Sequence, residues 1–152
     1  MRARLRRAGA CVMVAATLAA AIIPSLRPED VPIAEHHLFH AGIILLAVVA
    51  AALVVGGPSG AREQGSGLWL VPVVAAPLAM MFLMWPSTYD YLDTHPLAHA
   101  LDHIGLAVLG FAGAYGGQRY VRGVGWLVGL ATVGMAVIAA GGFGFAPPTP
   151  KL

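Results

Sequence analysis

The sequence predicts an all-α integral membrane protein, with about five transmembrane helices in a single domain over residues 1–152. Hydrophobic residues make up 59% of the chain and charged residues only 11%, and the mean hydropathy is +0.78. The chain contains five apolar runs, at residues 8–26, 34–55, 68–85, 97–115 and 124–143. At about 1.5 Å of rise per residue, each run is long enough as a helix to cross a hydrocarbon core of about 30 Å. The lipid bilayer is therefore the first expected partner.

The first run, residues 8–26, follows a cluster of four arginines. Arginines ahead of an apolar run are a topology signal of membrane proteins, so the pI near 9.0 does not indicate binding to nucleic acid. The triplet Ala19-Ala20-Ala21 would also suit a cleaved signal peptide, which would leave four spans. We prefer an uncleaved helix, because Ile22 and Ile23 extend the apolar run beyond this point.

The second and third runs differ in their prolines. Residues 34–55 begin at a histidine cluster and end at Gly56-Gly57-Pro58, ahead of a segment with the composition of a loop. Residues 68–85 contain Pro72 and Pro77, which a membrane helix tolerates but which should kink it. The polar residues 86–96 that follow are predicted to form a second loop.

The fourth run, residues 97–115, begins at the second histidine cluster, and Pro96 suits the first position of its helix. Residues 116–123 contain two arginines and a Gly-Gly pair, and they are predicted to form a loop. Residues 124–143 form the last helix, and the Pro-rich tail 144–152 is predicted to be extended. Glycines recur in the last two helices, which permits close packing between them.

The basic residues assign a direction to these helices. With a cytoplasmic N-terminus, seven of the nine basic residues face the cytoplasm, and only Arg27 and Lys151 face outwards. This distribution satisfies the positive-inside rule for a multi-pass protein of the cell membrane, meaning the inner or plasma membrane. Both histidine clusters then lie at the outer ends of their helices and face the periplasm or the cell exterior.

All six histidines lie near the starts of the second and fourth runs. Each cluster has two histidines four residues apart, which places them on one face of a helix, and His95 continues this spacing in the second cluster. The segment His36-x3-His40-Ala-Gly42 also resembles His99-x3-His103-Ile-Gly105. The likeness predicts a parallel duplication with both pairs at one depth; chance similarity is the alternative in a sequence so rich in small apolar residues.

Ionisable side chains at membrane depth need partners and are therefore candidates for function. Imidazoles from two helices favour a transition metal, and its expected ligands are His36, His40, His99 and His103. A zinc site with thiolate ligands is not expected, because Cys11 is the only cysteine. Copper is favoured, because methionine thioethers are predicted at a depth similar to that of the histidines. Further candidates for ligands, or for groups that orient the ligands, are His37, His95, Asp102, Glu35, Asp90, Tyr89, Met80, Met81 and Met84.

Structural alternatives accompany these assignments. The methionines also suit packing, and His37 points about 100° away from His36 and would face water. An acid near a helix N-terminus, such as Asp93, is stabilised there by the helix dipole. The protein could instead be an accessory subunit of a larger membrane complex, in which the histidines are structural or conduct protons. A further alternative is an electron-transfer protein in which His40 and His103 bind haem b. The sequence shows no obvious nucleophile, so we do not expect an enzyme.

One stretch of the chain resembles a known family. The residues Trp85-Pro86-x2-Tyr89-Asp90-x5-Pro96-x2-His99-Ala-Leu-Asp102-His103 resemble the CtaG family of caa3-type cytochrome c oxidase assembly factors, as does the earlier His36-x3-His40. The resemblance implies a multi-helix membrane protein that supplies copper to a terminal oxidase, or assists its assembly. It points to the same four histidines, with Asp102 at the position of a family glutamate. Pro86 follows Trp85 directly, where the family has a histidine, and another copper enzyme is therefore an alternative client.

Overall fold

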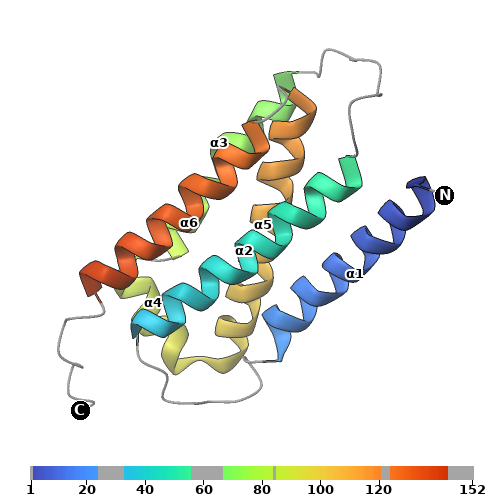
Figure 1. Ribbon diagram of the computed structural model, residues 1–152. Coiled ribbons are helices and arrows are strands. Elements are labelled where there is room, and N and C mark those ends of the chain that lie inside the picture. Colours follow the sequence, from blue (N-terminus) through green and yellow to red (C-terminus); the bar gives the residue numbers. More distant parts are fainter. Residues whose placement is uncertain (1, 24–32, 56–66, 84, 121–123, 144–152) are drawn as a thin grey trace.

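The computed structural model describes residues 2–23, 33–55, 67–83, 85–120 and 124–143, and over these ranges the chain is helical without strands (Figure 1). The predicted all-α class is therefore confirmed for this part of the chain. The elements are α1 (Arg2–Ile22), α2 (Ile33–Val55), the short 3-10 helix η2 (Gly67–Trp69), α3 (Leu70–Leu83), α4 (Pro86–Thr94), α5 (Pro96–Tyr120) and α6 (Val124–Phe143). Among the described residues, three helices are long and apolar enough to cross a membrane, over Arg4–Ile22, His36–Val55 and Pro96–Tyr120.

Helices α2 and α5 form the centre of the bundle. In Figure 1, α2 lies between α1 and α6, and it packs against both of them and against α5. Helix α3 packs on α5. Ile44 and Val48 of α2 form the main core cluster with Leu106 of α5 and Met80 of α3, all of them fully buried. Helix α2 thus buries one side against its neighbours, while Leu38 and Leu45 remain exposed on another.

Glycines let the central helices approach closely. A Cβ atom at Gly110 of α5 would lie 3.3 Å from Cγ2 of Ile44, and one at Gly129 of α6 would lie 2.9 Å from Val48. A larger residue at either position would require its neighbour on α2 to shift. The glycine-bearing faces of α5 and α6 therefore bring α2 into contact with both helices, as close packing at small residues requires.

Two segments predicted as loops are helical instead. Residues 86–94 form α4, which begins with Pro86 after the extended Trp85 and ends at the non-helical His95. Helix α5 continues through the Gly-Gly pair to Tyr120, whereas residues 116–123 were expected to form a loop. Both glycines are buried, and a Cβ at Gly116 would lie 2.8 Å from Pro72. The pair therefore serves helix packing against α3 rather than a turn.

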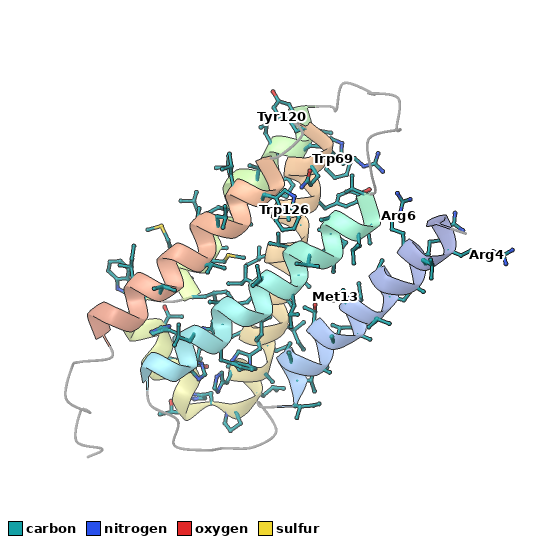
Figure 2. The ribbon with its side chains drawn as sticks, in the orientation of Figure 1. Arg4, Arg6, Met13, Trp69, Tyr120 and Trp126 are labelled. Atoms are coloured by element: carbon teal, nitrogen blue, oxygen red, sulfur yellow. The ribbon has the colours of Figure 1, made fainter. Side chains whose placement is uncertain are left out.

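The two ends of the bundle differ in chemistry. Figure 2 shows Arg4 and Arg6 at the start of α1, towards the end of the bundle that carries Trp69, Tyr120 and Trp126. The histidine-bearing starts of α2 and α5 lie at the opposite end. Large apolar side chains are exposed along the outer helices, among them Val12, Leu78, Leu127 and Ile138. Exposed apolar sides between a basic, aromatic end and a histidine-bearing end are typical of a protein surrounded by lipid.

Candidate metal centre

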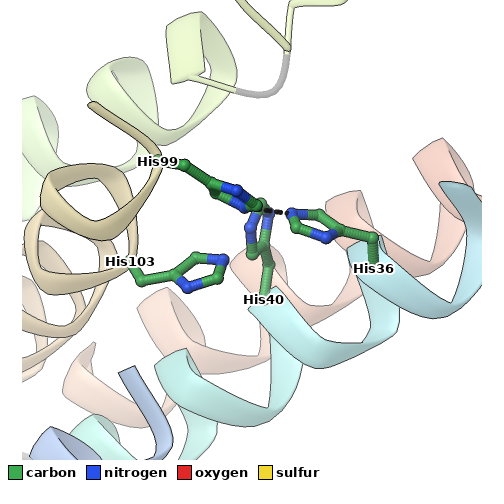
Figure 3. A group of neighbouring side chains, drawn as sticks. All are labelled: His36, His40, His99 and His103. Carbon is green, nitrogen blue, oxygen red and sulfur yellow. Dashed lines mark hydrogen bonds between the residues drawn. The ribbon is translucent and has the colours of Figure 1, made fainter. Parts of the chain in front are cut away.

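The two histidine pairs meet between α2 and α5. Each helix carries its pair one turn apart, so both imidazoles of a pair point to the same side (Figure 3). One ring nitrogen from each of His36, His40, His99 and His103 can be chosen so that all four atoms lie within 4.8 Å of one another. This group is called the histidine cluster below. His36, His40 and His103 are buried, and His99 is partly buried.

The four rings contact one another in a closed circuit. Their centroids are 4.3 Å apart for His36 and His40, and 4.9 Å apart for His40 and His103. The circuit continues from His103 to His99 at 4.5 Å and returns from His99 to His36 at 4.8 Å. Because each ring touches the next, all four imidazoles surround one point between the two helices.

The nitrogen positions suit a single metal ion. Bonds of about 2.0–2.1 Å in tetrahedral geometry place the ligand nitrogens of neighbouring imidazoles about 3.3 Å apart. The Nε2 atoms of His36 and His99 lie 3.1 Å apart, and the widest separation in the histidine cluster is 4.8 Å. Side-chain movements of an ångström or less would therefore bring all four nitrogens to bonding distance. The histidine cluster can hold a metal ion, and the geometry does not specify which one.

The two deeper histidines each have a further neighbour. His103 forms a hydrogen bond with the backbone of Ala21, in the last turn of α1, and its ring makes a T-shaped contact with Phe39 at a centroid distance of 5.5 Å. Ala21 is fully buried against Ile43 and Ala107. When an imidazole donates one N–H to a carbonyl, its lone pair lies on the other nitrogen. The end of α1 therefore fixes the orientation of the His103 ring, a contribution that no residue pattern could have revealed because it comes from the backbone.

Asp102 lies beside His40 inside the bundle. Its Oδ2 is 3.6 Å from Nε2 of His40, and both side chains are almost fully buried. Neither carboxylate oxygen has a hydrogen-bond partner among the described residues. An ionised carboxylate in such a place is costly unless a cation lies near it. The sequence singled out Asp102 as a neighbour of the paired histidines, and the structure places it beside His40.

His37 and His95 lie outside the histidine cluster, in two different settings. His37 was a candidate supporting residue with exposure to water as the alternative; that alternative is wrong, because only 2% of its surface is exposed, and its ring centroid is 6.1 Å from that of His40. His95 precedes α5, so it does not continue the helical face of His99 and His103 as its spacing suggested. Its Nδ1 lies 2.8 Å from the carbonyl oxygen of Tyr91, and the two rings stack. His95 is exposed and belongs to the junction of α4 and α5.

The methionine candidates are placed differently from one another. Met80 is fully buried in the apolar core cluster with Ala41 and Leu106, which follow His40 and His103 by one and three residues. It therefore packs in the layer next to the histidine cluster. Met81 is half exposed. Met84 lies outside the described residues, as do the side chains of Glu35 in α2 and of Tyr89 and Asp90 in α4.

No protein-family model, curated protein or solved structure matches this chain. The likeness to the CtaG family thus rests on its motif residues alone, and the functional conclusion has to come from the site.

Proposed function

We propose that this protein is an integral membrane copper-binding protein that assists the assembly or metallation of a cytochrome c oxidase or another copper enzyme. The observation that carries the proposal is the histidine cluster: four imidazoles from two packed helices, in mutual contact and largely buried. Buried polar rings inside an apolar bundle are costly, and a shared metal ion would offset that cost.

The donor set supports copper. All four donors are imidazole nitrogens, which suit copper, zinc, nickel and iron, and the chain has no pair of cysteines for a thiolate site. For a given set of nitrogen donors, Cu(II) binds most tightly among the divalent first-row metals. The likeness to a family of oxidase assembly factors agrees with this choice and points to an oxidase, or another copper enzyme, as the client.

Complete coordination by protein side chains favours a carrier over an enzyme. Catalytic metal sites usually keep one position open for water or substrate, whereas four protein ligands fill a tetrahedral shell. His99 is the most exposed member of the histidine cluster, so a metal ion would enter and leave beside it. We therefore assign the protein no catalytic reaction and expect it to pass its metal to a partner.

The membrane arrangement follows from the two ends of the bundle. We place five helices across the membrane, namely α1, α2, α3, α5 and α6, with the N-terminus in the cytoplasm. Arg4, Arg6 and Arg7 are exposed at one end, and Arg119 donates hydrogen bonds from Nε and Nη2 to the Tyr115 hydroxyl near the same end. Basic and aromatic residues at this end support a cytoplasmic orientation, which puts the histidine cluster at the outer face.

We disfavour a b-type haem as the cofactor of the same histidines. Two axial imidazoles must approach a flat porphyrin from opposite faces, with the macrocycle between them. The rings of His40 and His103 are 4.9 Å apart at their centroids, and the rings of His36 and His99 contact them from the side. The porphyrin would have to occupy the volume that these two rings fill.

Copper binding by purified protein tests the proposal. The wild-type chain in detergent should bind about one copper ion, and a variant with alanine at positions 36, 40, 99 and 103 should bind none above background. His95→Ala is the matched control, because His95 is an exposed histidine of the same region outside the histidine cluster. Equal copper in the wild type and the fourfold variant would refute the binding site.

The role in metallation needs a separate test in cells. Loss of the gene should lower the copper content of a membrane copper enzyme, and added copper or the wild-type gene should restore it. The fourfold variant should fail to restore it at normal copper supply. A stoichiometric partner that co-purifies equally with the wild type and the fourfold variant, without any change in its copper content, would instead favour an accessory subunit.

A further inference from the structure

The carboxylate of Asp102 is the one described acidic side chain in the interior of this bundle. The aspartate lies on α5, between His99 and His103 in sequence, and only 4% of the residue is exposed. Its one ion-pair contact among the described residues is with His40, at 3.6 Å between Oδ2 and Nε2. That distance exceeds a hydrogen bond, so the carboxylate faces the histidine cluster without being satisfied by it.

The described cationic side chains cannot compensate this charge. Arg4, Arg6 and Arg7 are exposed in the first turns of α1, and Arg119 is exposed at the far end of α5, where it contacts Tyr115. Asp102 belongs instead to the histidine-bearing half of α5. Within the described structure, the group that can bring a positive charge to Asp102 is the histidine cluster, either alone or with a bound ion.

We propose that Asp102 supplies the negative charge that makes the histidine cluster favour a divalent over a monovalent cation. This inference rests on the proposed metal binding and adds the charge of the preferred ion. A bound cation favours the ionised form of a nearby carboxylate. The Coulomb energy between the carboxylate and the ion scales with the charge of the ion, so Asp102 stabilises a divalent ion twice as strongly as a monovalent ion at the same position.

The carboxylate lies directly beside one of the four histidines, His40. Histidines that bind metals commonly direct their second ring nitrogen to a carboxylate or a carbonyl. His40 has Asp102 beside Nε2, and His103 has the backbone of Ala21. Of the two deeper histidines, only His103 is held by a hydrogen bond, whereas the Asp102 carboxylate lies beside His40 without forming one. Removing the charge of Asp102 should therefore lower the affinity for the metal ion, and lower it more for an ion of higher charge.

The test compares copper in its two oxidation states. Affinities for Cu(I), without oxygen, and for Cu(II) are measured by chelator competition on the wild type, Asp102→Asn, Asp102→Glu and Glu63→Gln. Glu63→Gln removes the same charge from the sequence between α2 and α3. Asp102→Asn should weaken Cu(I) binding about 10-fold and Cu(II) binding about 100-fold, because the logarithm of the loss doubles with the charge of the ion. Glu63→Gln should change neither affinity.

The outcomes separate this inference from the proposed function. If the wild type binds no more copper than the fourfold alanine variant, both proposals fail. If the wild type binds both ions but Asp102→Asn loses Cu(I) and Cu(II) equally, or if the wild type does not take Cu(II), only the role of Asp102 is refuted. If Asp102→Asn does not fold, the Asp102→Glu variant provides the test, because it keeps the negative charge. Its ratio of Cu(II) affinity to Cu(I) affinity should stay within about threefold of the wild-type ratio. A larger fall in that ratio would refute the inference.

Discussion

His36 on α2 and His99 on α5 are 63 residues apart in the sequence, yet their Nε2 atoms lie 3.1 Å apart. This contact closes the more exposed side of the histidine cluster, since His99 is its only member that is not buried. Between two neutral imidazoles, one nitrogen donates and the other accepts. A cation bound by both rings would replace that hydrogen bond, so α2 and α5 stay linked at this end in either state.

Substitution of His99 should remove one ligand at a modest cost to the stability of the bundle. In His99→Ala, we expect X-ray absorption to give about three nitrogen neighbours for copper instead of about four. The copper affinity should fall by about 100-fold or more, which exceeds the usual cost of losing a group that only orients a ligand. Unfolding without metal should show a loss of only about 0.5–1.5 kcal/mol, because the substitution removes the hydrogen bond to His36 while His99 itself is only partly buried. An unchanged coordination number would show that His99 is not a ligand.

Met80 should behave as a packing residue. It is fully buried among Ala41, Ile44, Val48 and Leu106, so the Met80→Leu substitution conserves both volume and apolar character. We expect the free energy of unfolding to fall by less than about 1.5 kcal/mol, and the Cu(I) affinity to remain at the wild-type value. A loss of Cu(I) affinity, with unchanged stability, would show instead that the Met80 thioether reaches the metal.

Helix α6 provides a matched pair of glycines for testing the packing of the bundle. In Gly129→Ala the new Cβ would lie 2.9 Å from both methyl carbons of Val48, so we expect a loss of about 1–3 kcal/mol in the free energy of unfolding. Gly134 has no described atom within 4 Å of its Cβ position. Gly134→Ala should be neutral, or stabilising by up to about 1 kcal/mol, because alanine favours helix. Unfolding by detergent titration measures both, and equal effects would contradict the packing of α6 on α2.

Accessibility to a membrane-impermeant thiol reagent tests the orientation. In a Cys11→Ala background, His95→Cys should be labelled in intact cells, because His95 is exposed at the histidine-bearing end. Tyr120→Cys, exposed at the other end of α5, should be labelled only after the membrane is permeabilised. The reverse pattern would place the histidine cluster on the cytoplasmic side.

The order of hydrophobic and polar residues was enough to predict α2 and α6 almost to the residue. A long apolar run in lipid forms a helix, because a helix satisfies the hydrogen bonds of its own backbone. Local geometry likewise placed His36 with His40, and His99 with His103, because residues four apart share a helical face. The same reasoning failed for Pro86–Thr94, whose polar composition suggested a loop although the segment forms α4.

What the tertiary structure decided depends on contacts between helices. The Gly-Gly pair at residues 116–117 looks like a helix end in the sequence, but close packing on Pro72 of α3 keeps it helical. The burial of His37 and the approach of Ala21 to His103 require α2 and α1 to be in place around the site. Residue spacing determined which histidines could act as pairs. The packing of α2 on α5 decided that the pairs meet, because a contact across 63 residues depends on where two helices lie and not on the pattern within either one.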